Sequence, residues 1–125
     1  MTPESDHLRF TILEHDHPFL HWDLLMQQEE SLATWRLLQK PSKGLWIPSE
    51  KLPDHRLIYL DYEGPVSGGR GHVTQFCTGN FVISCDEFVG GEVAVDKVFR
   101  LSDCELGTNA FCRFCNTDQP EWRFE

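Results

Sequence analysis

Three histidines and two aspartates lie within nine residues, in the stretch His15-Asp16-His17-Pro18-Phe19-Leu20-His21-Trp22-Asp23. Imidazole and carboxylate groups together suit a borderline divalent ion such as Mn²⁺ or Zn²⁺. A site with three protein ligands also keeps positions open for water or substrate. The stretch is therefore a candidate for a catalytic metal site. The alternative is that these are polar residues of a surface hairpin turn.

Strand geometry reduces this stretch to three candidate ligands. Side chains two residues apart on a β-strand lie on the same face, so His21 and Asp23 can converge on one ion. His15 ends the preceding strand, and the turn that follows lets the chain double back beside that face. The predicted metal ligands are therefore His15, His21 and Asp23. We expect His17 to face solvent and Asp16 to organise the turn.

A second group of polar and aromatic side chains follows between Asp54 and Gly64. If this segment is a strand, as its composition predicts, His55 and Tyr59 share one face and point into one pocket. An imidazole with a pKa near neutral can protonate a leaving oxygen or stabilise an oxyanion, and a phenol can supply a hydrogen bond. His55 and Tyr59 are the predicted catalytic residues, with a purely structural role as the alternative for His55.

The cysteines give a weaker signal. Cys112-Arg113-Phe114-Cys115 has the spacing of a zinc knuckle or a redox pair, but the segment is predicted to be a strand, which would turn the two thiols to opposite faces. The five cysteines of the chain are odd in number and irregularly spaced. This argues against a complete disulfide framework and for reduced thiols in the cytoplasm. We expect most of them to be small core residues.

Short runs of aromatic and β-branched residues, each closed by Gly, Pro, Asn or Asp, recur along the chain and are typical of successive strands. The predicted strands span Leu8–Glu14, Leu20–Gln28, Ser31–Gln39, Leu45–Pro48, Arg56–Tyr62, Gly71–Thr78, Asn80–Phe88, Glu92–Leu101, Thr108–Cys115 and Glu121–Phe124. Ser49–Leu52 is the one predicted helical turn. We expect an all-β domain over residues 1–125, as a closed or nearly closed antiparallel β-barrel of about eight strands, or as a sandwich. The glycine-rich segment Gly64–Gly71 is expected to be a simple turn, with a lid as the alternative.

The formal net charge of −9 restricts the classes of partner. An acidic surface repels nucleic acid as a whole, which argues against broad non-specific binding, whereas a local cationic pocket or a bound metal remains compatible with this charge. The sequence has no apolar run long enough to span a bilayer, and Met1–Asp6 is acidic where a secretory signal would be basic and then apolar. We therefore expect a cytoplasmic monomer that does not bind membranes.

Together, the two clusters resemble the 3′-phosphoesterase domain of bacterial DNA ligase D. That family carries His, five residues, His, one residue and Asp, then a Trp-containing strand, then Asp-His with Tyr four residues past that His, and then an acidic-Gly turn. Here these elements are His15, His21 and Asp23, the run Ser31–Trp35, Asp54-His55 with Tyr59, and Glu63-Gly64. The resemblance covers Phe10 to Gly71.

This resemblance implies a Mn²⁺-dependent phosphoesterase, with Zn²⁺ as a possible alternative metal. The enzyme would remove a 3′-phosphate or a 3′-terminal ribonucleotide from the end of DNA or RNA. The family pattern assigns the metal to His15, His21 and Asp23, and the scissile phosphate to His55 and Tyr59. A ligase or repair partner would be a separate protein.

The chain departs from the family at several polar positions. Leu25 stands where the family has Arg, and Leu13 stands where it has Gln. Pro53 stands where the family has an acidic residue, and Gln39 where it has Lys. Lys40, Arg36, Arg56 or Arg70 could replace the missing cations. Because of these losses, a second hypothesis is a non-catalytic barrel that binds nucleic-acid ends or a repair partner. A third is a small-molecule or sugar-binding barrel of the cupin type.

Overall fold

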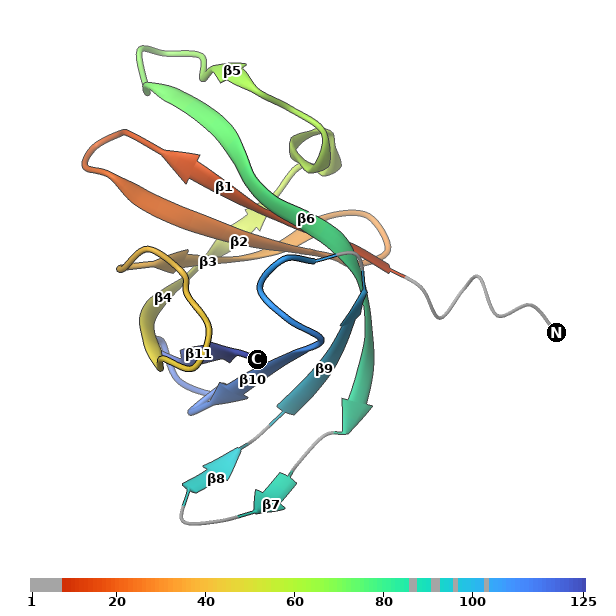
Figure 1. Cartoon of the computed structure of the whole chain (residues 1–125). Helices are drawn as coiled ribbons and strands as arrows, with labels where there is room; N and C mark the ends of the chain where they lie inside the picture. Colours follow the sequence, from red (N-terminus) through yellow and green to blue (C-terminus); the bar gives the residue numbers. More distant parts are fainter. Residues whose placement is uncertain (1–7, 86–87, 91–92, 96, 103) are drawn as a thin grey trace, which may run out of the picture.

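The computed structural model describes residues 8–85, 88–90, 93–95, 97–102 and 104–125, and most of its strands form an antiparallel barrel (Figure 1). Within these residues, eight strands follow one another around the barrel in the order β1-β2-β3-β4-β11-β10-β9-β6, and pairing of β6 with β1 closes it. The predicted all-β fold, a closed antiparallel barrel of about eight strands, is confirmed. The elements are β1 (Leu8–His15), β2 (His21–Gln27), β3 (Leu32–Leu37), β4 (Ile47–His55), the 3-10 helix η2 (Leu57–Leu60), β5 (Gly64–Pro65), β6 (His72–Cys85), β7 (Phe88–Gly90), β8 (Val93–Val95), β9 (Lys97–Ser102), β10 (Asn109–Arg113) and β11 (Glu121–Phe124).

Strand β6 closes the barrel because it is long enough to pair along both edges. One edge pairs with β1, whereas on the other edge its start pairs with β5 and its end with β9. Figure 1 shows β6 running from β5 at one end of the molecule toward the β7–β8 hairpin at the other. The sequence predicted two strands here, Gly71–Thr78 and Asn80–Phe88. Instead, Gly79 pairs with Phe10, and the strand continues through it to Cys85.

Alternate side chains of the wall strands fill the barrel interior. The ring of Trp122 lies 5.0 Å from that of Trp35 and 5.6 Å from that of Phe99, measured between centroids. Burial of this apolar surface is the main favourable contribution to folding. The buried members of this core are Phe10, Ile12, Trp22, Leu24, Met26, Leu37, Ile47, Cys77, Phe81, Phe99, Leu101, Leu106, Ala110, Cys112, Trp122 and Phe124.

A second, smaller apolar cluster lies on the other face of the wall, because neighbouring residues of a strand point to opposite sides. We call it the outer cluster; its buried members are Leu13, Leu25, Leu32, Leu60 and Val73. Leu60 belongs to η2, whereas the other four belong to β1, β2, β3 and β6. The outer cluster therefore holds the chain between β4 and β6 against the outside of the barrel.

Two local predictions are wrong. Ser49–Leu52 is not a helical turn, because these residues belong to β4 and pair with β3 from Ser49↔Leu37 to Leu52↔Thr34. Arg56–Tyr62 is not a strand, because β3 begins at Leu32, opposite His55, and the pairing of β4 with β3 ends there. The chain turns into η2 instead.

Two further predictions fall partly or wholly outside the described residues. The predicted strand Glu92–Leu101 includes residues 92 and 96, which lie outside them, and its described parts form β8 and β9. Met1–Asp6 also lies outside the described residues.

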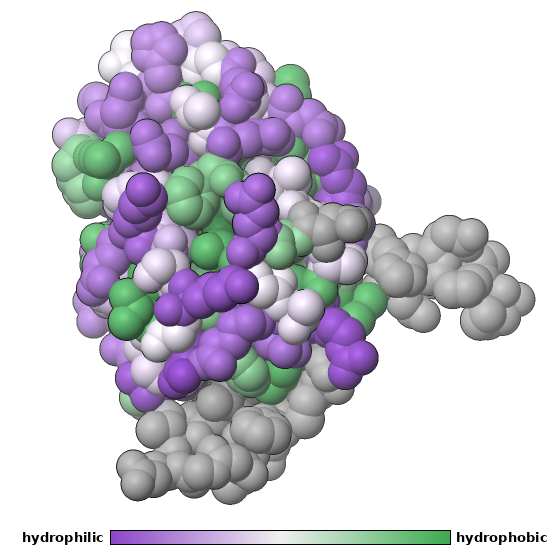
Figure 2. Space-filling model, in the orientation of Figure 1, coloured by the Kyte–Doolittle hydropathy of each residue, from purple (hydrophilic) through white to green (hydrophobic). Residues whose placement is uncertain are grey.

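The face of the molecule in Figure 2 carries mainly hydrophilic side chains, with hydrophobic groups in small patches between them. This distribution agrees with the burial of most apolar side chains in the barrel core and the outer cluster. In the part of the chain that the structure describes, no helix has the length and apolar character needed to cross a bilayer.

Two isoleucines provide a test of the core. Ile12 on β1 is fully buried, whereas Ile83 on β6 is 55% exposed. We expect Ile12→Ala to lower the free energy of unfolding by about 2–5 kcal/mol, because it leaves a cavity beside the closing strand pair. The matched variant Ile83→Ala should cost less than about 1 kcal/mol. Urea denaturation measures both, and equal losses would contradict this assignment of the core.

Candidate functional site

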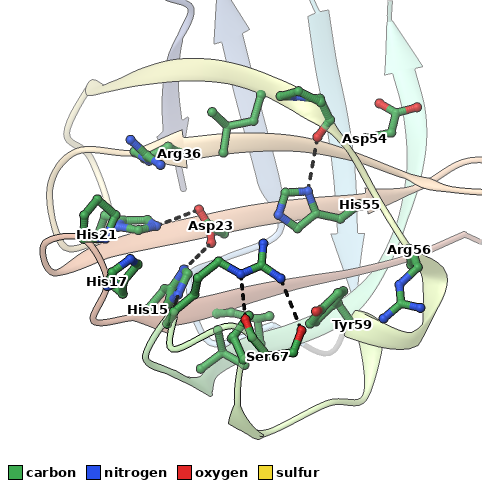
Figure 3. Close-up of a pocket in the computed structure, with 17 residues that line it drawn as sticks. His15, His17, His21, Asp23, Arg36, Asp54, His55, Arg56, Tyr59 and Ser67 are labelled. Carbon is green, nitrogen blue, oxygen red and sulfur yellow. Dashed lines mark hydrogen bonds and ion pairs between the residues drawn. The ribbon is translucent and has the colours of Figure 1, made fainter.

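A pocket of about 580 Å³ opens on the outer face of the wall, where β1 to β4 meet the segment between β4 and β6. Figure 3 shows its side chains converging from the sheet and from the loops that cross it. The pocket is lined by Leu13, His15, His17, Pro18, His21, Asp23, Arg36, Leu52, Pro53, Asp54, His55, Arg56, Tyr59, Val66, Ser67, Arg70 and Val73. Both predicted clusters thus border the same space.

The β1–β2 hairpin brings the three predicted ligands together. Its register pairs His15 with His21 and Leu13 with Asp23, so the three polar side chains share the outer face. His15 Nδ1 lies 3.3 Å from Asp23 Oδ2, and His21 Nε2 lies 3.2 Å from Asp23 Oδ1. Within the described residues, this is the group of three or more His, Cys, Asp or Glu side chains whose ligand atoms all lie within 4.8 Å of one another.

A backbone carbonyl orients each of the two imidazoles. His21 Nδ1 donates to the Phe19 carbonyl oxygen at 2.8 Å, and His15 Nε2 donates to the Arg70 carbonyl oxygen at 2.8 Å. The other nitrogen of each ring faces Asp23. In a neutral imidazole that nitrogen carries the lone pair that a metal ion would take. Metal-binding histidines in proteins commonly make the same outer hydrogen bond. The arrangement therefore suits a cation bound between the two rings and the carboxylate.

The Asp23 carboxylate lacks one partner. Its Oδ1 is buried 3.2 Å from His21 Nε2, but it accepts no hydrogen bond of normal geometry from any described residue. A buried charged oxygen without a partner is costly, and a bound cation would remove that cost. This orphaned oxygen is the second observation that fits a metal at His15, His21 and Asp23.

The pKa shifts have the same electrostatic origin. Burial alone raises the pKa of Asp23, but the hydrogen bonds and charge interactions with His15 and His21 outweigh burial and bring it to about 2. The hydrogen bond to Asp23 in turn raises the pKa of His15. The cluster therefore holds an ionised carboxylate at neutral pH and attracts positive charge.

The other residues of the turn depart in part from expectation. Asp16 organises the turn as predicted, because its Oδ1 accepts a hydrogen bond of 2.8 Å from the His72 backbone N–H. That bond also lowers the pKa of Asp16. His17, in contrast, is not turned to solvent: it is half-buried and lines the pocket.

His55 and Tyr59 meet for a reason other than the predicted one. They do not share a strand face, since His55 ends β4 and Tyr59 lies in η2. The 3-10 turn still brings their ring centroids to 5.9 Å, and both line the pocket. His55 Nδ1 donates to the Pro53 carbonyl oxygen at 3.1 Å, which leaves Nε2 available. Figure 3 shows the His55 ring across the pocket from His15 and His21.

Arginines supply positive charge around the pocket. The sequence named these arginines as candidates but could not show where they lie. Arg36, Arg56 and Arg70 all line it. Arg36 on β3 is the register partner of Asp23 and lies 3.5 Å from Glu50, and its buried Nε has no partner among the described residues. Arg70 donates from Nε to the Ser67 carbonyl oxygen at 2.7 Å. An acidic protein thus has a locally cationic pocket.

Leu25 and Leu13, two of the expected departures from the family pattern, do not block the pocket. Leu25 is fully buried in the outer cluster beneath it, and Leu13 forms part of its floor beside Val73. Gln39 and Lys40 are exposed on the β3–β4 connection and are not among the lining residues. The pocket therefore combines an apolar floor with a polar and cationic rim.

The Cys112–Cys115 spacing does not correspond to a ligand group. Cys112 is buried in the barrel core, and Cys115 follows the end of β10, beyond Phe114 with its φ of 59°. Neither belongs to a cluster of three or more metal-ligating side chains in the described part of the chain.

Comparison with known proteins gives one match to a family. A family model described as the DNA Ligase D 3′-phosphoesterase domain matches residues 13–108. No curated protein matches the chain. The matched region contains all five predicted site residues.

Gly71 tests how the loop that carries Arg70 is held over the pocket. Its φ is +78°, and a Cβ there would overlap Asp16 Oδ1 and lie 2.7 Å from His17 Cβ. Gly69 has a similar φ of +70°, but a Cβ at that position would have no described atom within 4 Å. We expect Gly71→Ala to lower the free energy of unfolding by at least about 1 kcal/mol more than Gly69→Ala, measured by urea denaturation. Equal losses would show that the Asp16 contact does not constrain the loop.

Proposed function

Because the chain belongs to the DNA ligase D 3′-phosphoesterase domain family, we propose that it is a metal-dependent phosphoesterase acting on the 3′ ends of DNA or RNA. Its reaction would remove a 3′-phosphate or a 3′-terminal ribonucleotide. The observation that carries the proposal is the convergence of His15, His21 and Asp23 at the edge of a pocket lined by arginines.

The donor set of this site fits the metal that the family resemblance implies. Two imidazole nitrogens and a carboxylate oxygen suit Mn²⁺, and they suit Zn²⁺ as well. When bound, such an ion supplies Lewis-acid polarisation of a phosphate oxygen. The Phe19 and Arg70 carbonyl oxygens orient the two imidazoles, so the ligands are arranged before an ion arrives.

The remaining pocket residues provide the rest of the chemistry. Arg36, Arg56 and Arg70 would bind the phosphate oxygens, since guanidinium groups pair well with phosphate. The imidazolium form of His55, with Nδ1–H held by the Pro53 carbonyl oxygen, would donate its Nε2 proton to the departing 3′-oxygen as the bond to phosphorus breaks. The Tyr59 hydroxyl would hydrogen-bond the phosphate. Water would supply the oxygen that replaces the departing group on phosphorus.

A non-catalytic role is the second candidate, and the apolar residues of the outer cluster favour it. Leu13 and Leu25 stand where the family has polar contacts, and the net charge of −9 opposes binding of a long nucleic acid. In this role the same pocket would hold a nucleic-acid end, or the barrel would bind a repair protein, without turnover. A 3′-phosphorylated oligonucleotide distinguishes the two roles, because an end-binding module would retain affinity for it and release no phosphate.

Removal of the ligands tests the proposed activity. We expect the protein with Mn²⁺ to release inorganic phosphate from a 3′-phosphorylated oligonucleotide. Asp23→Asn and His21→Ala should each reduce the rate by more than about 100-fold, because loss of an outer-shell partner alone already costs roughly 10- to 100-fold at many metal sites. Mn²⁺ titration by calorimetry should show the matching loss of binding.

His72→Ala is the matched histidine control, since the His72 side chain is not one of the pocket's lining residues. Circular dichroism shows whether each variant folds, and Asp23→Asn keeps the size of the side chain. Full activity in a folded Asp23→Asn or His21→Ala variant would contradict the proposed centre.

The arginines test how the substrate is held. We expect Arg36→Ala to lower kcat/KM for the 3′-phosphorylated oligonucleotide by about 10- to 100-fold, because a charge-assisted contact to phosphate is lost. Arg36→Lys should recover part of the loss. Arg100→Ala on β9, which contributes no lining residue to the pocket, is the control. Unchanged kcat/KM in Arg36→Ala would remove Arg36 from the substrate site.

A further inference from the structure

Two cysteines that are far apart in the sequence meet on the barrel wall, away from the pocket. Cys77 lies on β6, and Cys104 lies in the connection between β9 and β10. Their Sγ atoms are 3.0 Å apart, and the two residues do not form a disulfide bond. Their thiols are therefore already in contact.

The turn that carries Cys104 is fixed by its own hydrogen bonds. The Leu106 backbone N–H donates to Cys104 Sγ at 3.3 Å, and the Gly107 N–H donates to the Cys104 carbonyl oxygen at 3.4 Å. Leu106 is buried in the barrel core, and the Gly107 φ of +125° brings this turn against the backbone of Glu125. The Cys104 thiol is thus held beside β6 by the core and by the turn.

The Cys77 side chain is largely buried, at 9% exposed, but it borders a cavity. A cavity of about 250 Å³ is lined by Cys77, Glu105 and neighbouring residues of β6, and Cys104 itself is half-buried. The hydrogen bond from Cys104 lowers the pKa of the Cys77 thiol, which favours its reactive thiolate form. Cys112, in contrast, is 1% exposed in the core.

We infer that Cys77 and Cys104 form a reversible disulfide when the protein meets a hydroperoxide. The Cys77 thiolate attacks one peroxide oxygen, so that an S–O bond forms, the O–O bond breaks and an alcohol or water leaves after taking up a proton. Cys104 then attacks the sulfenic sulfur; the S–S bond forms, the S–O bond breaks, and hydroxide leaves as water with the Cys104 proton. Two thiols lose two electrons, and the peroxide gains them.

The disulfide would link the β9–β10 connection to the strand that closes the barrel. Cys77 is the register partner of Ile12 on β1, next to the irregularity between Ile12 and Leu13. This modification does not depend on the proposed phosphoesterase activity, because neither cysteine lines the metal pocket.

Peroxide treatment followed by peptide mapping tests the inference. The whole chain is treated with hydrogen peroxide, its remaining thiols are alkylated, and it is cut with trypsin and a glutamate-specific protease. Cleavage after Glu105 separates Cys104 from Cys112, and a Cys85→Ala background leaves Cys77 as the single cysteine of its peptide. We expect a linked Cys77–Cys104 peptide, two hydrogen atoms lighter than the sum of its parts, which dithiothreitol separates.

Single variants provide the controls. Cys77→Ala and Cys104→Ala should each prevent the linkage, so that the remaining partner thiol can still be alkylated after brief peroxide treatment. Cys115→Ala should still form the link. Absence of the Cys77–Cys104 peptide in folded protein that keeps both cysteines, or its replacement by a link between other cysteines, would overturn the inference.

Discussion

The register of the β1–β2 hairpin is the constraint on which both the barrel and the candidate site depend. With His15 opposite His21, the inward side chains Trp22, Leu24 and Met26 enter the core and the outward ones form the ligand set. A slip of one residue would exchange the two faces, placing the ligands in the core and core residues outside. Because the core strongly favours one register, the energy of barrel folding also positions the ligands.

Local charge, and not net charge, determines what this pocket can bind. The chain carries −9 overall, yet Arg36, Arg56 and Arg70 surround a pocket in which one carboxylate is buried. Exposed acidic groups elsewhere are screened over about a Debye length, roughly 8–10 Å at moderate salt, whereas groups within the pocket interact directly with a ligand. A small anionic end group can therefore be attracted here even though a long polyanion is repelled by the surface as a whole.

Features that depend on local pattern could be predicted from the sequence, and features that depend on distant pairing could not. Short runs of aromatic and β-branched residues closed by turn residues predicted the strands. Strand parity, with the turn after His15, predicted the triad His15, His21 and Asp23. Ser49–Leu52 was misassigned because its strand character comes from the ladder with β3 and not from its own composition. Arg36 could be placed only once its pairing with Asp23 was known, and Cys77 and Cys104 are 27 residues apart, so no spacing rule links them.

The apolar residues Leu13 and Leu25 of the outer cluster have a structural role of their own. Leu13 and Leu25 pack with Leu60, and Leu60 anchors the η2 turn that carries Tyr59. The outer cluster that underlies the ligand triad therefore also fixes the other half of the pocket. An aliphatic floor keeps water away from Asp23, which strengthens its attraction to nearby positive charge and makes its unpartnered oxygen more costly. The apolar floor formed by Leu13 and Leu25 thus favours the cation that we propose between His15 and His21.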